Sequence, residues 1–227
     1  MTEQEIRQKA VELITSWLGA PKGSDTHHGI IDLYNSHKPL PRGARMSYSM
    51  DWCAATVSAV GVALGLTDIM PVECSCGELI KLHKALSQWV EDDAYIPKPG
   101  DLIMYSWSDD GVGDNTKAPN HVGMVVGVSG TTITVVEGNM GSPSHVGTRK
   151  IQVNARYIRG YCCPDYASKA DKPPMSNLDT TPPWYAEIWG QATDMGLVDG
   201  TRPEDPVTRA ECTAIVLRAL ETRKGEK

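Results

Sequence analysis

No apolar stretch of the 227-residue sequence approaches the roughly 18 to 20 residues that a membrane-spanning helix needs. The sequence therefore predicts no transmembrane segment. With 41% hydrophobic and 22% charged residues, its composition is typical of a soluble globular protein.

The N-terminus lacks the pattern of a secretory signal. Residues Met1 to Glu5 are acidic where a signal peptide carries basic residues, and no unbroken apolar core follows. We therefore expect synthesis in the host cytoplasm without a signal peptide. A substrate outside the membrane would then be reached only after release, by lysis, through a holin pore or by an unassigned route.

Positive charge is scarce. The formal net charge is -6 at pH 7, and the chain is acidic both before residue 179 and after it. Nucleic acids and anionic membranes are bound through basic patches that displace counterions. We expect neither nucleic acid nor membrane as a partner.

The six cysteines do not follow the spacing of a disulfide framework, and a cytoplasm keeps thiols reduced. Free thiols are therefore expected. Cys74 and Cys76 form a CxC pair, and Cys162 and Cys163 are adjacent. Neither spacing is usual for zinc ligands, so the sequence predicts no zinc site.

The length suits one full domain and a smaller module. Residues 167–183 have no apolar periodicity and carry two Pro-Pro pairs, which indicates a linker. We predict a catalytic domain over 1–166, this linker, and a helical module over 184–227.

Helical patterns occupy the first part of the chain. Thr2 and Glu5 form a capping-box pattern, after which apolar residues share one helical stripe: Ile6, Ala10, Val11, Ile14 and Leu18. The thirty or so residues after Pro21 show no sustained period and predict an irregular loop. Further helices are expected at 52–64, apolar almost all round, and at about 77–89.

After Asp101, short runs rich in β-branched and aromatic residues predict strands at about 102–107, 121–128, 131–137, 146–153 and 157–162. Helices followed by an antiparallel sheet, without β-α-β alternation, indicate the α+β class. Two more helices are predicted in the C-terminal module, at about 184–195 and 208–222.

Cys53 is the candidate nucleophile because it lies in the first turn of a predicted helix. Free N–H groups and the helix dipole stabilise a thiolate there. The other five cysteines lack this setting. A lone cysteine is more often a buried inert thiol, so Cys53 needs a nearby base.

His121 opens one strand of a predicted hairpin, and Glu137 and Asn139 end the other. A strict two-residue turn at Ser129-Gly130 would put His121 opposite Gly138. A three-residue loop with Gly130 in the left-handed region shifts the register by one and places Glu137 or Asn139 on the face of His121. We predict the three-residue loop. The alternative is that His121 and Glu137 are solvated residues at strand ends without a catalytic role.

In chain order, four blocks resemble the signature of CHAP domains: Asp51-Trp52-Cys53-Ala54-Ala55, Lys98-Pro99-Gly100-Asp101-Leu102-Ile103, His121-Val122-Gly123-Met124-Val125 and Glu137-Gly138-Asn139. The resemblance covers about residues 5–166. It implies a papain-like fold and cleavage of amide bonds in bacterial peptidoglycan, either between muramic acid and L-alanine or within the stem peptide or cross-bridge. It also implies that Cys53 is the nucleophile, His121 the base, Glu137 the orienting acid and Asn139 an auxiliary polar group near the histidine or the oxyanion.

Such chemistry needs no cofactor. Some CHAP endolysins carry a calcium loop of alternating aspartates before the cysteine, but residues 41–50 hold no carboxylate, so we predict no calcium there. The acidic loop 109–115 carries oxygen atoms that could bind a cation. We interpret it instead as a solvated turn.

Residues 182–221 resemble a single S-layer-homology repeat, a type of module that binds wall polymers and usually occurs in threes. Such a repeat would tether the enzyme to its substrate. A forty-residue helical pair is too small to be stable alone, so it packs on the catalytic domain or forms a homo-oligomer. A docking or dimerisation pair without wall affinity is the alternative.

The resemblance to CHAP domains implies a peptidoglycan hydrolase, an amidase or endopeptidase of endolysin type, and the missing signal peptide favours a phage or prophage origin. One alternative is a papain-like amidohydrolase acting on a cytoplasmic peptide or polyamine conjugate. Another is a non-catalytic cell-wall-binding protein, which intact Cys53, His121 and Glu137 argue against. Which amide bond is cut stays open.

Overall fold

The structure is a computed structural model that describes residues 1–111, 114–171, 183–198 and 213–216. It divides into two compact units, Met1–Asp171 and Lys172–Lys227. None of its described helices is long and apolar enough to cross a membrane.

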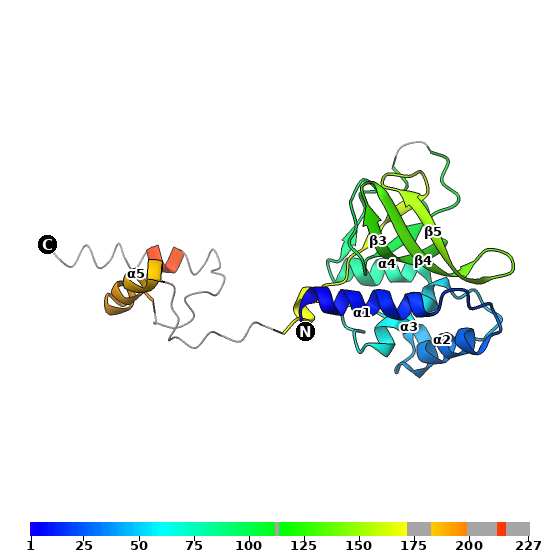
Figure 1. The fold of residues 1–227 in the computed structure, drawn as a ribbon, viewed down its shortest axis with the longest axis horizontal. Helices are drawn as coiled ribbons and strands as arrows, with labels where there is room; N and C mark the ends of the chain where they lie inside the picture. The colour runs from blue at the N-terminus through cyan, green and yellow to red at the C-terminus, as the bar shows by residue number, and fades with distance from the viewer. Residues whose placement is uncertain (112–113, 172–182, 199–212, 217–227) are drawn as a thin grey trace. The chain divides into compact units, whose positions relative to one another are not determined.

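The first unit combines helices with one antiparallel sheet. Its helices are α1 (Glu3–Ser16), α2 (Asp25–Ser36), α3 (Cys53–Ala63) and α4 (Cys76–Ala85), with short 3-10 helices η1 (Pro41–Gly43) and η2 (Tyr166–Lys169). The strands are β1 (Trp89–Val90), β2 (Leu102–Tyr105), β3 (His121–Ser129), β4 (Thr132–Met140), β5 (His145–Gln152) and β6 (Ile158–Cys162). They pair in the order β1-β6-β2-β3-β4-β5, and the helices lie together beside the sheet (Figure 1). The predicted α+β class is confirmed.

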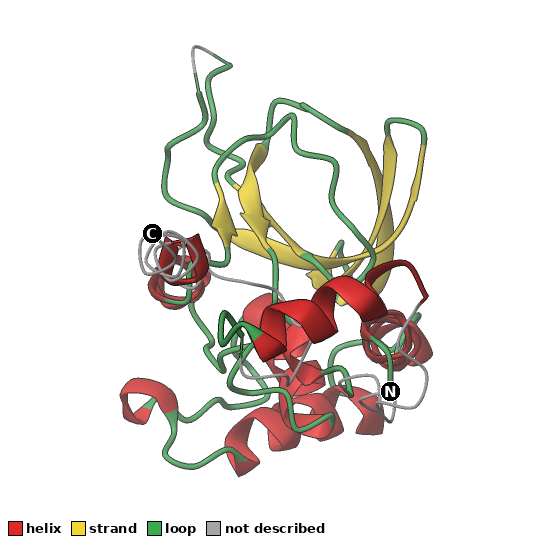
Figure 2. Cartoon of the chain, turned by 90° about the vertical axis from the view of Figure 1, so that its left-hand side faces the viewer, coloured by secondary structure: helices red, strands yellow, loops and turns green. Residues whose placement is uncertain are grey.

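The sheet curls, so that its strands have two buried faces (Figure 2). On β2, Leu102 and Met104 join the main core that the sheet shares with the helices. Ile103 and Tyr105 point the other way, into a second core inside the curl. Strand β2 is therefore buried on both sides, and it lies directly beside the strand that begins with His121.

Helix α1 begins as predicted, with both hydrogen bonds of the Thr2–Glu5 capping box. Ile6, Ala10, Val11 and Ile14 are buried. Leu18 is 42% exposed, because the helix ends at Ser16 before the stripe reaches that residue.

The predicted irregular loop after Pro21 is wrong, because it contains helix α2. The Ser24 side chain caps this helix by accepting from the N–H of His27. Ile30, Ile31 and Tyr34 then bury one face of the helix. A serine cap followed by this short stripe was the available signal, and the surrounding Gly, Pro and Asn residues obscured it.

Helix α4 is shorter than the predicted helix at 77–89. Ser87 adopts a φ of 57°, which stops the helix and turns the chain into β1. Leu82 and Leu86 are 37% and 44% exposed. His83 faces the core in their place and is fully buried.

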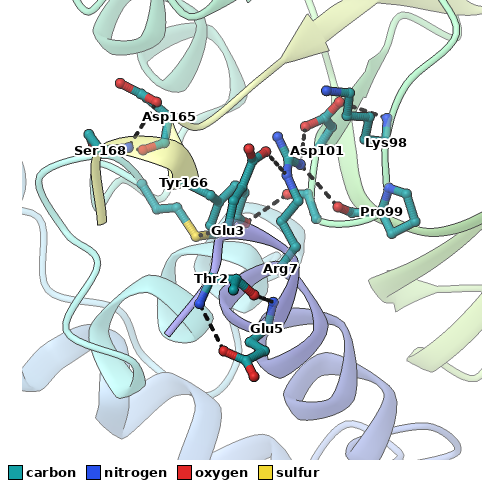
Figure 3. A network of polar contacts seen from close by, with 12 residues as sticks. Thr2, Glu3, Glu5, Arg7, Lys98, Pro99, Asp101, Asp165, Tyr166 and Ser168 are labelled. Atoms are coloured by element: carbon teal, nitrogen blue, oxygen red, sulfur yellow. Dashed lines mark hydrogen bonds and ion pairs between the residues drawn. The ribbon is translucent and has the colours of Figure 1, made fainter. Parts of the chain in front are cut away.

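The Lys-Pro-Gly-Asp block before β2 belongs to a structural clamp (Figure 3). The buried Asp101 carboxylate accepts hydrogen bonds from Arg7 of α1 at 2.9 Å and from the Lys98 N–H at 2.9 Å. Gly100 has a φ of 94°, and its carbonyl accepts from the Tyr166 hydroxyl. The block therefore fixes the start of β2 against α1 and η2.

In the second unit, the structure places α5 at Pro183–Asp194, where the first helix of the module was predicted. Residues 213–216 are also helical, and the remainder of the helix predicted at 208–222 lies outside the described residues. So do residues 172–182 of the predicted linker.

Candidate active site

Cys53 is the first residue of α3, where the sequence predicted it. Residues Cys53 to Gly61 are all buried, so this helix start lies inside the domain rather than on its surface. Its N-cap, Trp52, makes no side-chain capping bond. The first-turn N–H groups therefore remain available to an anion held at the Cys53 side chain.

His121 and Glu137 lie on neighbouring strands and form a buried pair. The distance between His121 Nε2 and Glu137 Oε2 is 3.0 Å, and the two residues are 7% and 0% exposed. A carboxylate on Nε2 fixes the proton there and leaves Nδ1 of the ring for the cysteine. The structure thus brings Cys53, His121 and Glu137 together.

The register that produces this pair arises from a β-bulge. Ser129 pairs with Thr132, so the β3–β4 turn has two residues and the predicted three-residue loop is wrong. Gly130 does adopt the predicted left-handed conformation, with a φ of 57°. The register then shifts by one between Val125 and Gly127, which returns Glu137 to the face of His121.

Two glycines in the signature blocks permit close packing at the site. A Cβ on Gly123 would lie 2.6 Å from Cγ of Glu137, so its absence makes room for the carboxylate side chain. A Cβ on Gly138 would lie 2.0 Å from Oγ1 of Thr56 on α3. Helix α3 can therefore approach β4 closely only where β4 carries a glycine.

Arg149 of β5 holds the other side of the Glu137 carboxylate. Its Nε donates to Oε1 at 2.7 Å and its Nη2 donates to Oε2 at 2.9 Å. The guanidinium also lies over the Trp107 ring at 4.9 Å. The sequence analysis missed Arg149, because an arginine in mid-strand carries no motif until the register of β4 and β5 is known.

The electrostatics favour a charged cysteine–histidine pair. A hydrogen bond with Cys76 contributes most to lowering the pKa of Cys53 well below its ordinary value; burial opposes the shift, and the bond with His121 and its charge add to it. Burial lowers the pKa of His121, but hydrogen bonds with Cys53 and Glu137 outweigh it and raise this pKa to about 9. Both shifts favour a thiolate beside an imidazolium.

The pKa of Glu137 stays below its ordinary value although the side chain is buried. Burial would raise it, but the hydrogen bonds and positive charges of His121 and Arg149 lower it. The carboxylate is therefore ionised near neutral pH, where it can stabilise the imidazolium.

Asn139 has a different set of partners. Its amide nitrogen donates to Asp51 at 3.0 Å, and its oxygen accepts from Ser144 at 2.7 Å. Ser144 in turn accepts from the Trp52 ring nitrogen at 3.1 Å. This network ties the end of β4 to the residues just before Cys53, and Ser144 had no sequence signal.

Trp107 and Tyr105 flank the histidine. Their rings stack at 4.8 Å, and each ring centroid lies 5.9 Å from that of His121. Tyr105 is fully buried, whereas Trp107 is 38% exposed. An exposed aromatic surface thus adjoins the buried pair.

Within the described residues, no group of three or more His, Cys, Asp or Glu side chains is placed to hold a metal ion. In the acidic loop 109–115, Asp109 faces Arg156, and the Asp110 carboxylate accepts from Lys117 at 2.6 Å. The five cysteines that the structure describes are free thiols: Cys53, Cys74, Cys76, Cys162 and Cys163.

One of the three comparisons with known proteins found a match. No curated protein and no solved structure matches the chain. The family model of the CHAP domain matches residues 45–139, a segment that begins before Cys53 and ends at Asn139. CHAP domains are typically cysteine- and histidine-dependent amidohydrolases, so this match supports an enzyme with peptidoglycan amidase or peptidase activity in general.

Proposed function

We propose that the protein hydrolyses an amide bond of peptidoglycan with Cys53 as nucleophile, His121 as acid and base, and Glu137 as the group that orients His121. The observation that carries the proposal is the buried His121–Glu137 pair, 3.0 Å apart, beside a cysteine at the start of α3. Cleavage of an amide bond by a cysteine needs three groups close together: an activated sulfur, a proton donor and a fixed carboxylate.

In the proposed reaction, the Cys53 thiolate attacks the carbonyl carbon and forms a C–S bond. The carbonyl electrons move to oxygen, where backbone N–H groups at the start of α3 can bind them. Collapse of this intermediate breaks the C–N bond, and the His121 imidazolium gives its proton to the leaving amine. Water then attacks the thioester while His121 takes up a proton, which releases a carboxylate and the thiolate.

Turbidity of purified cell walls tests this reaction. Wild-type protein should clear a panel of Gram-positive-type walls, and mass analysis of the fragments should show free stem peptides or severed cross-bridges. Cys53→Ala should clear none of them. Cys74→Ala is the matched control, because it removes a partly exposed thiol of the same domain and should leave clearance unchanged. Equal clearance by wild type and Cys53→Ala would contradict the proposal.

For the C-terminal module we propose binding to a wall polymer. Its support is the resemblance to an S-layer-homology repeat, with α5 at the first predicted helix. Full-length Cys53→Ala should sediment with intact walls, because it cannot digest them. Walls stripped of secondary polymers by acid should retain much less of it. Equal binding to both walls would favour the alternative of a docking or dimerisation helix pair.

The proposed setting is that of a phage or prophage endolysin, made in the host cytoplasm and active on the wall after release. Expression alone should then leave host cells intact, and co-expression with a holin should lyse them. Cys53→Ala with the same holin is the control and should not lyse them quickly. Lysis on expression without a holin would contradict this setting.

A further inference from the structure

A second buried thiol lies beside the proposed nucleophile. The sulfur atoms of Cys53 and Cys76 are 4.0 Å apart, and the two residues are 7% and 8% exposed. Each cysteine is the first residue of a helix, Cys53 of α3 and Cys76 of α4, so the expectation that the other five cysteines lack this setting is wrong for Cys76. Two helix N-termini therefore meet at one pair of sulfur atoms.

The chain before α4 is attached to α3 by a defined set of bonds. The Ser58 hydroxyl of α3 donates to the Glu73 carbonyl at 2.8 Å and accepts from the Glu73 N–H at 3.0 Å. The buried Glu73 carboxylate accepts from the N–H groups of Cys74 and Ser75 at 2.7 and 3.0 Å. Cys76 is thus positioned by the same helix that carries Cys53.

Arg42 completes this support. Its Nε and Nη2 donate to the two oxygens of Glu73 at 2.9 and 2.7 Å. Burial would raise the pKa of Glu73, but these bonds and the two backbone N–H groups lower it. The support is therefore ionised and rigid near neutral pH. A cysteine held in this way has a fixed place relative to its neighbour.

The two thiols differ in charge. The hydrogen bond with Cys53 contributes most to raising the pKa of Cys76, and burial adds to the shift. These opposite directions favour a proton on Cys76 and a negative charge on Cys53. A protonated thiol is a weak hydrogen-bond donor, and a thiolate is an acceptor. With the negative charge on Cys53, the bond between them would run from the Cys76 S–H to the Cys53 sulfur.

We propose that Cys76 is a positioning residue that donates an S–H hydrogen bond to the Cys53 thiolate and so keeps the nucleophile charged and in place. The inference rests on the proposed role of Cys53. The interactions that lower the pKa of Cys53 come from His121 of β3, Cys76 of α4 and the N–H of Ala54 of α3 itself. Cys76 is the one among them that has no role in the chemistry described above.

The test is the pH dependence of Cys53 alkylation by iodoacetamide, followed by mass spectrometry of the peptide that contains Cys53. In Cys76→Ala the midpoint should rise by about one pH unit, because a donor to the thiolate is lost. Alkylation at a pH below both midpoints should slow about tenfold. Cys76→Ser keeps a hydroxyl donor and should restore most of the shift.

Cys74→Ala serves as the matched control, because it removes a thiol from the same segment without touching Cys53, and its midpoint should equal that of wild type.

A role in packing alone would lower the melting temperature of Cys76→Ala and leave the midpoint in place, which would overturn the proposal. If Cys76→Ala does not fold, the alkylation midpoint of Cys76→Ser tests the proposal. A folded Cys76→Ser protein whose Cys53 titrates like an ordinary thiol overturns the proposal, and a low midpoint supports it.

Alkylation does not depend on wall hydrolysis, so the two proposals fail separately. A midpoint shift in a protein that clears no wall would support the role of Cys76 and remove the proposed substrate. Clearance that depends on Cys53 but comes with an unshifted midpoint in Cys76→Ala would keep the proposed function and overturn the role of Cys76.

Discussion

Glu137 and Asp101 are two of the buried carboxylates that an arginine holds in this domain, and they differ from each other in their third partner. Glu137 of β4 binds Arg149 and the imidazole of His121. Asp101, just before β2, binds Arg7 and the backbone N–H of Lys98 (Figure 3). The side chains of both acids are at most 1% exposed.

The third partner decides what each pair can do. A backbone N–H does not titrate near neutral pH, so the Asp101 pair can only fix the chain. An imidazole gains and loses a proton near neutral pH, so the Glu137 pair can also control the charge of His121. A buried arginine–carboxylate pair is thus structural by itself and becomes part of a reactive site through the side chain that it orients.

The largest effect is expected for Glu137→Gln. The amide can still accept from His121 but no longer stabilises its positive charge, so kcat/KM for wall fragments should fall about a thousandfold. The pKa of His121, about 9 in the wild type, should fall, and the basic limb of the pH–rate profile should move to lower pH. A basic limb that stays near pH 9 would show that the carboxylate does not control His121.

Asp101→Asn is the counterpart on the structural side. Arg7, 8% exposed, would lose a buried charge partner, so the free energy of unfolding should fall by about 3 kcal/mol in urea titrations. The activity of the folded fraction and its pH–rate profile should not change. A displaced basic limb in this variant would break the comparison, because it would connect the clamp to the chemistry.

Gly138→Ala should lower activity about a hundredfold. The new Cβ would lie 2.0 Å from Oγ1 of Thr56, so α3 must move away from β4 and carry Cys53 from His121. Activity and thermal melting measured together would separate displacement from unfolding. Gly127→Ala is the matched control on the same hairpin, since its Cβ would meet no atom within 4 Å, and it should retain activity.

Arg149→Met should lower activity about tenfold, since an orienting partner of Glu137 is lost. Removal of the guanidinium leaves more of the carboxylate charge for the imidazolium, so the pKa of His121 should rise. The basic limb should therefore move to higher pH, opposite to the shift in Glu137→Gln. Arg7→Met, which removes the arginine of the structural pair, should leave the limb in place.

The smallest effect is expected for Asn139→Ala. Its hydrogen bond to Asp51 is exposed, and such a bond contributes about 1 kcal/mol or less, so activity should fall no more than about fivefold. Ser144→Ala removes the next group of the same network and should behave similarly. A loss of a hundredfold in Asn139→Ala alone would instead indicate direct contact with the reacting atoms.

Much of the site could be predicted from the sequence because its residues lie in local patterns. A buried helix that starts with Cys53 and a hairpin that starts with His121 are readable without a structure. The face shared by His121 and Glu137 was predicted correctly, but for the wrong reason. The shift in strand register comes from the bulge after Val125 and not from the β3–β4 turn. Bulges have no strong sequence signature.

Long-range partners could not be predicted. Arg149 reaches Glu137 only through the pairing of β4 and β5, and Cys76 reaches Cys53 only because Ser58 holds the loop before α4. Helix α2 was missed because its short apolar stripe is surrounded by turn residues. Sequence patterns specify local structure well, whereas contacts between distant segments depend on register and packing.

The most direct test of the central claim is to find the acyl group on the enzyme. Wild-type protein would be mixed with purified muropeptides, quenched in acid within the first turnovers and digested, and each cysteine peptide would be weighed. The account predicts the mass of the acyl fragment on the peptide that contains Cys53, and product release that stops in Cys53→Ala. An adduct on another side chain, or undiminished release of products by Cys53→Ala, would contradict it.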